Sequence, residues 1–89
     1  MISNTLKKQL RRRAHELHPI VMIGDKGLTE AVQLEIERAL LDHELVKIKI
    51  ANNDRDERQR IIDAICQARD AELIQKIGKI AVIYRENEE

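Results

Sequence analysis

The chain has 89 residues, which is enough for one domain spanning residues 1–89 and too few for a second. Its 16 basic and 16 acidic residues give zero formal net charge, yet residues 1–28 hold six basic and two acidic groups and the remainder holds ten basic and fourteen acidic ones. Such asymmetry is typical of a protein that binds a polyanion through one face. One cysteine excludes an intramolecular disulfide, no apolar run can span a bilayer, and the first residues lack the apolar core of a secretory signal. We therefore expect a cytoplasmic protein without a membrane partner.

The first predicted element is an amphipathic helix that ends before Pro19, because the residue before a proline resists the α region. Ser3 or Thr5 is a suitable cap. The apolar stripe consists of Leu6, Leu10, Ala14 and Leu17, and the other sides carry Lys7, Lys8, Arg11, Arg12, His15 and His18. Arg13 is expected near the edge of the stripe, where a structural role is the alternative to RNA binding. Only Glu16 balances these charges nearby, whereas surface charge that serves solubility is usually mixed in sign. The pattern therefore favours polyanion binding.

A glycine loop follows the first predicted strand. Residues 20–23 are an apolar run, as expected for a strand covered on both faces, and Gly24-Asp25-Lys26-Gly27 comes directly after it. A helix then begins near Thr29, so the loop lies beside a helix N-terminus, whose N–H groups attract phosphate. Glycine allows a tight turn and close approach, and a GXXG loop in RNA-binding KH domains clamps the nucleotide backbone in this way. The spacing fits neither a P-loop nor a dinucleotide fold, and a purely structural turn is the alternative.

The second predicted helix, capped by Thr29, leads into an alternating strand. Its inner face is expected to hold Leu28, Val32, Ile36, Ala39, Leu40 and His43, with Leu34 and Leu41 on the opposite face. Residues 45–50 alternate, so that Val46, Ile48 and Ile50 point to one side of the strand and Lys47 and Lys49 to the other.

The rest of the chain predicts a third helix and a hairpin. Asp54 and Glu57 have the spacing of a capping box, and the helix is expected to bury Ile61, Ala64, Ile65 and Ala68 with Ile62 alongside. Strands at 71–77 and 79–85 flank Gly78, which suits a turn with positive φ, and residues 86–89 are expected to be a frayed acidic tail. The order αβαβαββ predicts a compact α/β domain with a four-stranded mixed sheet and helices packed on it.

No constellation of side chains predicts catalysis, a metal site or a cofactor, so we expect a protein that is not an enzyme. Cys66 has no histidine near it in sequence and fits a packing role. His15 and His18 lie one helical turn apart, but no cluster supplies the further ligands that a metal needs, and a solvated pair is expected. His43 is expected to be a core or cap residue.

The lack of aromatic residues narrows the mode of binding. Tyr84 is the only one and is expected in the core, so no platform exists on which bases could stack. Recognition is then expected to rest on phosphate contacts, loop amides and RNA shape, with a structured RNA as the target. Charge alone does not exclude DNA, but the sequence contains no helix-turn-helix, zinc finger or basic zipper.

Three segments together resemble the CRM-domain family, and in particular its stand-alone bacterial members, the YhbY family. The segments are Ile23-Gly24-Asp25-Lys26-Gly27-Leu28-Thr29-Glu30, Ala39-Leu40 with His43 to Lys49, and Leu73 to Lys79 with Tyr84-Arg85. The resemblance implies an α/β domain similar to the C-terminal domain of translation initiation factor three. It also implies RNA binding, association with precursor large ribosomal subunits during ribosome assembly, and an RNA-contacting role for residues 24–27.

The candidate RNA-binding residues lie on the first helix, in the glycine loop and on the second strand: Lys7, Lys8, Arg11, Arg12, Gly24, Asp25, Lys26 and Gly27, with Arg13, Lys47 and Lys49 as second-rank candidates. The alternative role of Lys47 and Lys49 is to shield the polar face of the sheet. Because the first helix leads through Pro19 into the strand that ends at the loop, helix and loop are expected to form one compact region. The rival hypothesis is a protein-interaction or dimerisation module that uses Leu34 and Leu41 or a sheet edge; on the leading hypothesis we expect a monomer.

Overall fold

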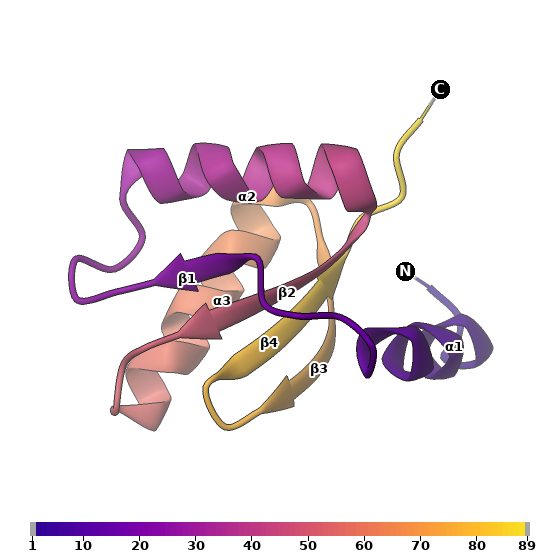
Figure 1. Cartoon of the computed structure of the whole chain (residues 1–89), viewed down its shortest axis with the longest axis horizontal. Coiled ribbons are helices and arrows are strands. Elements are labelled where there is room, and N and C mark those ends of the chain that lie inside the picture. Colours follow the sequence, from indigo (N-terminus) through magenta and orange to yellow (C-terminus); the bar gives the residue numbers. More distant parts are fainter. Residues whose placement is uncertain (1, 89) are drawn as a thin grey trace.

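The computed structural model describes residues 2–88 and has the predicted order αβαβαββ (Figure 1). The elements are α1 (Asn4–Ala14), β1 (Val21–Ile23), α2 (Glu30–His43), β2 (Leu45–Ile50), α3 (Arg55–Arg69), β3 (Glu72–Ile77) and β4 (Ile80–Tyr84). The strands form one sheet in the order β1-β2-β4-β3. β1 and β2 are parallel, and the other two pairs are antiparallel, which confirms the mixed sheet.

Each helix is preceded by a capping residue whose side chain accepts a hydrogen bond from a backbone amide in the first turn of that helix. Ser3, not Thr5, caps α1 by accepting from the amide of Leu6 at 3.1 Å, and Thr29 caps α2. Asp54 caps α3. The predicted capping box is only half formed, because Asn52 Oδ1, not Glu57, accepts from the amide of Asp54 at 2.7 Å.

Two apolar clusters lie on opposite faces of the sheet. The larger joins α2 and α3 to one face, and its most buried members include Ile36, Leu40, Ile48 and Ile65. On the other face α1 buries Leu10 and Ala14 against Leu45, Ile74 and Val82, with Tyr84 at the edge. Because α1 covers only one end of that face, the remainder of the face is open (Figure 1).

The expected burial is wrong on the open face of the sheet and at the edges of two helices. The apolar run at residues 20–23 was expected to be covered on both sides, but Met22 is 61% exposed because no helix packs over it. Ala64 and Ala68 of α3 and His43 of α2 are exposed as well, because each helix buries a narrower stripe than its pattern suggests. Leu34 and Leu41 lie on the outer side of α2 as predicted.

The first helix is shorter than predicted. It ends at Ala14, four residues before the residue that precedes Pro19, and residues 15–20 form a non-helical connection to β1. The sequence predicted that His15 and His18 lie one turn apart on this helix. That prediction is wrong, because both residues lie beyond the end of α1.

The end of the chain is tied to α2. Asn87 donates from its backbone amide to Glu44 Oε2 at 2.8 Å and from its side chain to the carbonyl oxygens of Leu40 and Leu41. The carbonyl oxygen of Leu40 also accepts from the amide of Glu44 at 2.9 Å, whereas that of Leu41 lies in the last turn of α2, where helix carbonyls lack an intrahelical donor. The expected frayed tail is thus wrong at Asn87, while Glu89 lies outside the described residues.

No helix within residues 2–88 is both long enough and apolar enough to cross a membrane.

Candidate functional site

The glycine loop is a tight turn closed by its own backbone. The amide of Gly27 donates to the carbonyl oxygen of Gly24 at 3.0 Å, and the amide of Thr29 donates to that of Gly27 at 3.0 Å. Gly27 has φ +69°, a left-handed conformation that a side chain disfavours. Gly24 has neither a positive φ nor any atom within 4 Å of where its Cβ would lie. The fold therefore requires glycine at position 27 but not at position 24.

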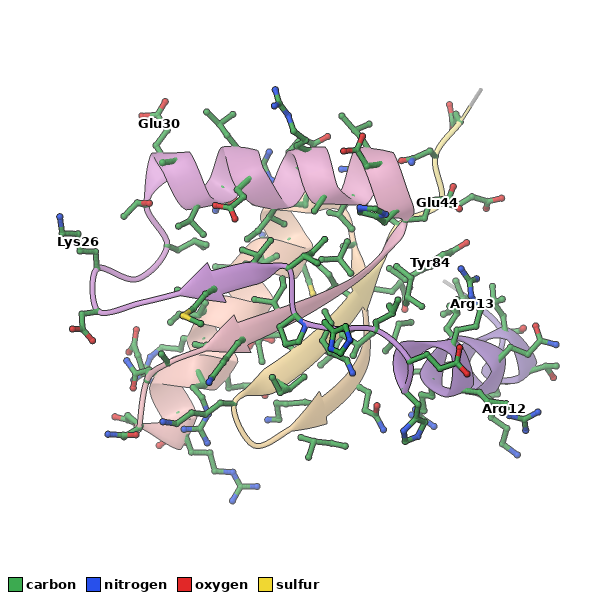
Figure 2. All side chains as sticks on the ribbon, in the orientation of Figure 1. Arg12, Arg13, Lys26, Glu30, Glu44 and Tyr84 are labelled. Atoms are coloured by element: carbon green, nitrogen blue, oxygen red, sulfur yellow. The ribbon has the colours of Figure 1, made fainter. Side chains whose placement is uncertain are left out.

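The loop also offers backbone donors. Within the described chain, the amides of Asp25 and Lys26 donate to no protein acceptor, and both side chains are exposed. Lys26 extends from the tip of the loop, away from the sheet (Figure 2). Asp25 offsets the charge of Lys26, so the loop contributes amides and shape more than net charge.

One cationic residue of α1 has a structural contact. Arg11 Nε donates to the carbonyl oxygen of Ile74 at 3.1 Å. This contact ties α1 to β3, where the ladder with β4 is interrupted between Leu73 and Gln75. Sequence reasoning placed Arg11 among the phosphate contacts and missed this role.

The other cations of α1 are open to solvent. Lys8, Arg12 and Arg13 are exposed and Lys7 is half-buried, and none of the four has a carboxylate partner within residues 2–88. Arg12 points away from the sheet, whereas Arg13 lies on the side of α1 that faces Tyr84 (Figure 2). Burial raises the pKa of Tyr84, and the carboxylates of Glu44 and Glu86 raise it further, while the nearby charge of Arg13 lowers it.

The basic helix and the glycine loop do not form one compact region, so this expectation is wrong. They lie at opposite ends of the longest dimension, which is 34 Å (Figure 1). The reason is that the connection at residues 15–20 carries the chain from α1 to the start of β1, and β1 then leads away from α1. Proximity in sequence between helix and loop is therefore not proximity in space.

Lys47 and Lys49 of β2 lie between those two ends. They point to the open face, because the alternate residues Val46, Ile48 and Ile50 are buried beneath α2 and α3. Lys49 is exposed and pairs in register with Met22, two residues before Gly24. Lys47 is half-buried and lies nearer to α1.

Two cavities flank the connection between α1 and β1. The larger, about 560 Å³, is lined by Arg13, Glu16, Leu17, His18, Ile20, His43, Leu45 and Lys47. The smaller, about 180 Å³, is lined by His15, Lys47, Gln75, Ile77, Ile80 and Val82. Lys47 lines both cavities, and His15 and His18 line different ones. The open face thus carries mainly basic and apolar side chains, and among the described residues Glu16 is the one acidic residue that lines either cavity.

A third cavity, of about 290 Å³, contains cations that sequence reasoning missed. Its lining consists of Arg55 and Arg58 from α3, Lys76 from β3, and Gly78. The charge count along the sequence did not indicate this group of cations, because residues 29–89 contain more acidic than basic residues. One signal was available: Arg55 and Arg58 follow the cap Asp54, where a helix favours acidic side chains.

The remaining candidate groups show no reactive arrangement. Cys66 packs beside the larger core cluster, and its pKa is raised by burial and by the charges of Asp63 and Glu72, so the thiolate is disfavoured. Within residues 2–88, no three His, Cys, Asp or Glu side chains gather as a metal would require.

Comparisons with known proteins point in one direction. The CRS1 / YhbY (CRM) domain model matches residues 2–85. A protein of Haemophilus influenzae named RNA-binding protein is 49% identical over 88 residues, which cover 99% of this chain and 89% of that protein. A protein of Pseudomonas aeruginosa named probable RNA-binding protein is 46% identical over 81 residues, which cover 91% and 78%.

The fold is also similar to a solved structure. The solution structure of a hypothetical protein from Staphylococcus aureus, described as a candidate RNA-binding protein, matches with a TM-score of 0.86 and 35% identity. The match covers 100% of this chain and 93% of that one.

Proposed function

Because the chain belongs to the CRS1 / YhbY (CRM) domain family, whose model matches residues 2–85, we propose that it is a non-catalytic, cytoplasmic RNA-binding protein. Its relatives in Haemophilus influenzae and Pseudomonas aeruginosa are named for RNA binding. The observation that carries the proposal is the set of unpaired cations that runs from α1 across the open face of the sheet to the glycine loop.

The proposed contacts are mainly to phosphates. Lys7, Lys8 and Arg12 supply charge at one end, Lys47 and Lys49 supply it on the sheet, and Lys26 supplies it at the loop, where the amides of residues 25 and 26 donate to a phosphate oxygen. Since the only aromatic residue, Tyr84, packs beneath α1, bases are not stacked on the protein. Folded or helical RNA, which is recognised by shape and backbone, suits this surface.

We propose ribosomal RNA in precursor large ribosomal subunits as the biological target. This step rests on the resemblance of the glycine loop and the flanking segments to the bacterial YhbY family. Crosslinking in cells followed by sequencing of the bound RNA tests it directly: large-subunit ribosomal RNA is the expected product. Enrichment of unrelated messenger or transfer RNA would contradict the target while leaving RNA binding intact.

RNA binding itself is tested by its salt dependence. With about four phosphates neutralised, log affinity for a structured large-subunit RNA fragment falls with log salt at a slope of roughly −3 to −4. The double variant Lys8→Gln/Arg12→Gln removes two exposed charges from α1 and reduces the magnitude of that slope by about 1.4–1.8. The matched control Arg38→Gln/Arg60→Gln removes two exposed charges from α2 and α3 and leaves the slope unchanged. Affinity that does not respond to salt would refute the mechanism.

A protein-interaction module is the second candidate, favoured by Leu34 and Leu41, which are 63% and 58% exposed on the outer side of α2. Sedimentation at micromolar concentration separates the two functions. RNA binding predicts a monomer that sediments faster only when RNA is added. The second candidate would be favoured if the protein is a dimer without RNA and the double variant Leu34→Gln/Leu41→Gln is a monomer.

A further inference from the structure

Three connections meet at the end of the sheet that carries the glycine loop. The amide of Ala51 donates to the carbonyl oxygen of Ile23 at 2.9 Å, which places the β2–α3 connection beside the start of the loop. The amide of Ile50 donates to the carbonyl oxygen of Lys79 at 2.8 Å, which places the β3–β4 turn beside the same connection. The loop, the start of α3 and the turn therefore form one end of the molecule (Figure 1).

The cavity lined by Arg55, Arg58, Lys76 and Gly78 lies at this end. We call it the α3 cavity. Its charged lining is entirely cationic. Of the acidic groups nearest in sequence, Asp54 accepts from the first amides of α3, Glu57 pairs with Arg60 at 3.1 Å, and Asp56 is exposed and does not line the cavity. A cavity that is lined by cations and, within residues 2–88, by no carboxylate has the charge and donors that an anion needs.

The cations are partly held in place. Arg58 Nη1 donates to the carbonyl oxygen of Asn52 at 2.7 Å, which fixes the guanidinium and leaves its other nitrogens available. Lys76 Nζ donates to Gln59 Oε1, a bond that positions the ammonium while its charge stays unbalanced. Arg55 is exposed and has no hydrogen-bond or ion-pair partner within residues 2–88.

Helix stability does not account for Arg55 and Arg58. They occupy the first and fourth positions of α3, next to the positive end of the helix dipole, where a cation is unfavourable. The same dipole favours an anion bound at that point. Asp54, Asp56 and Glu57 at the same helix end offset part of this unfavourable charge, and a bound anion would offset more of it.

We propose that the α3 cavity is a phosphate-binding site. Given the function proposed above, on which this part of the inference rests, its ligand is a backbone phosphate of the bound RNA. β1 and β3 are the two edges of the sheet, three strand spacings or about 14 Å apart. The glycine loop after β1 and the cavity beside β3 therefore act together across one end of the sheet, and the charge that accompanies the loop comes from α3 and β3 instead of α1.

The test uses the full chain and the variant Arg55→Gln, with Arg38→Gln on the outer side of α2 as the control, because Arg38 is exposed and pairs with no carboxylate within residues 2–88. Arg55→Gln is expected to weaken binding of the large-subunit RNA fragment by about tenfold and to lower the magnitude of the salt slope by about 0.7–0.9. Its Tm is expected to stay the same or rise, because a cation is removed from the positive end of the helix dipole. Arg38→Gln leaves the affinity within about twofold. Adding Lys76→Gln to Arg55→Gln weakens binding further.

Nuclear magnetic resonance of the arginine Nε–H groups identifies the source of the phosphate. Shifts of the Arg55 and Arg58 signals with RNA but not with inorganic phosphate support a site that needs the polyanion. Shifts with both support a general phosphate site.

Unchanged affinity of Arg55→Gln together with unmoved signals in both titrations overturns the proposal while RNA binding by α1 still stands. If the wild-type chain binds no RNA, the proposed function fails, and the titration with inorganic phosphate still decides whether the cavity binds phosphate.

Discussion

Arg11 donates a hydrogen bond from Nε to the carbonyl oxygen of Ile74, 3.1 Å away and 63 residues later in the chain. Ile74 lies at the irregularity between Leu73 and Gln75, and a bulge leaves backbone groups without ladder partners. Arg11 thus satisfies an edge-strand carbonyl and holds α1 on the sheet. Arg11, which the sequence placed among the RNA-binding cations, therefore has a structural role in the fold.

Arg11→Gln is expected to lower the free energy of unfolding by about 1–2 kcal/mol, because a charged hydrogen bond to a part-buried carbonyl is lost. Arg12→Gln, one position along the same helix, is expected to change it by less than about 0.5 kcal/mol, because Arg12 is exposed and has no partner within residues 2–88. Urea denaturation measures both. Equal values for the two variants would contradict a structural role for Arg11.

The two glycines of the loop respond differently to substitution. Gly27→Ala is expected to cost about 1–2 kcal/mol of stability, since alanine disfavours φ +69°. Gly24→Ala is expected to leave stability unchanged or slightly raised, because its backbone is unstrained and its Cβ would enter open space.

The RNA affinity of Gly24→Ala tests whether RNA approaches the backbone closely at Gly24. A methyl group between the backbone and a phosphate is expected to weaken binding in Gly24→Ala although the protein is fully folded. Thermal unfolding and RNA titration of the same sample separate the two effects. Normal RNA affinity in Gly24→Ala would mean that the RNA does not approach this position.

The ion pair between Glu37 and Arg85 makes stability depend on acid pH. Two hydrogen bonds of 2.8 Å from Arg85, with a further one from Arg69, hold the pKa of Glu37 below its ordinary value of 4.5. A lowered pKa in the folded state stabilises the protein fully above about pH 4.5, and this contribution is lost as the pH falls through the folded value.

Glu37→Gln is therefore expected to lower the free energy of unfolding by about 1–3 kcal/mol at pH 7. The difference between variant and wild type should shrink below pH 4.5. Denaturation at several pH values measures it, and a difference that grows in acid would have the wrong sign. Glu35→Gln, at an exposed position of the same helix, is the control.

Asn87 is expected to contribute to stability although it is the third residue from the end of the sequence. Asn87→Ala removes two side-chain hydrogen bonds to the last turn of α2 and should cost about 1–2 kcal/mol in urea denaturation. Glu88→Ala, at an exposed neighbour, should cost almost nothing. Equal stability of the two variants would show that the end of the chain is frayed after all.

Lys49 provides a test of the open face. Lys49→Gln is expected to weaken RNA binding several-fold with unchanged stability, because Lys49 is exposed and no acidic residue pairs with it within residues 2–88. Arg38→Gln on the outer side of α2 is the control. If both variants bind equally well, the RNA does not cross the sheet.

Local patterns in the sequence predict the elements well. The alternation of residues 45–50, the positive φ of Gly78 and the caps at Thr29 and Asp54 are all confirmed. These features depend on neighbours within a few residues, so the sequence contains the information directly. The exposure of Met22 was missed because it depends on which helix covers which part of the sheet.

The arrangement of the site is less predictable for the same reason. The distance between α1 and the glycine loop is set by the direction of β1, which no local pattern reveals. The α3 cavity combines Arg55 and Arg58 with Lys76, eighteen residues further along the chain, through the pairing of β3 with β4. Such groupings arise from topology, and a count of charges along the chain cannot find them.

The proposed RNA contacts on α1 and in the glycine loop lie at opposite ends of a molecule whose longest dimension is 34 Å, so the proposed function would make the protein a two-ended binder. A short oligonucleotide can occupy only one end, whereas a long or folded RNA that reaches both ends gains avidity, because binding at the second end is intramolecular. Affinity would then depend first on the length and geometry of the RNA and only afterwards on its sequence. A rigid body of this kind can also hold two RNA segments at a fixed spacing, which a flexible basic tail cannot do.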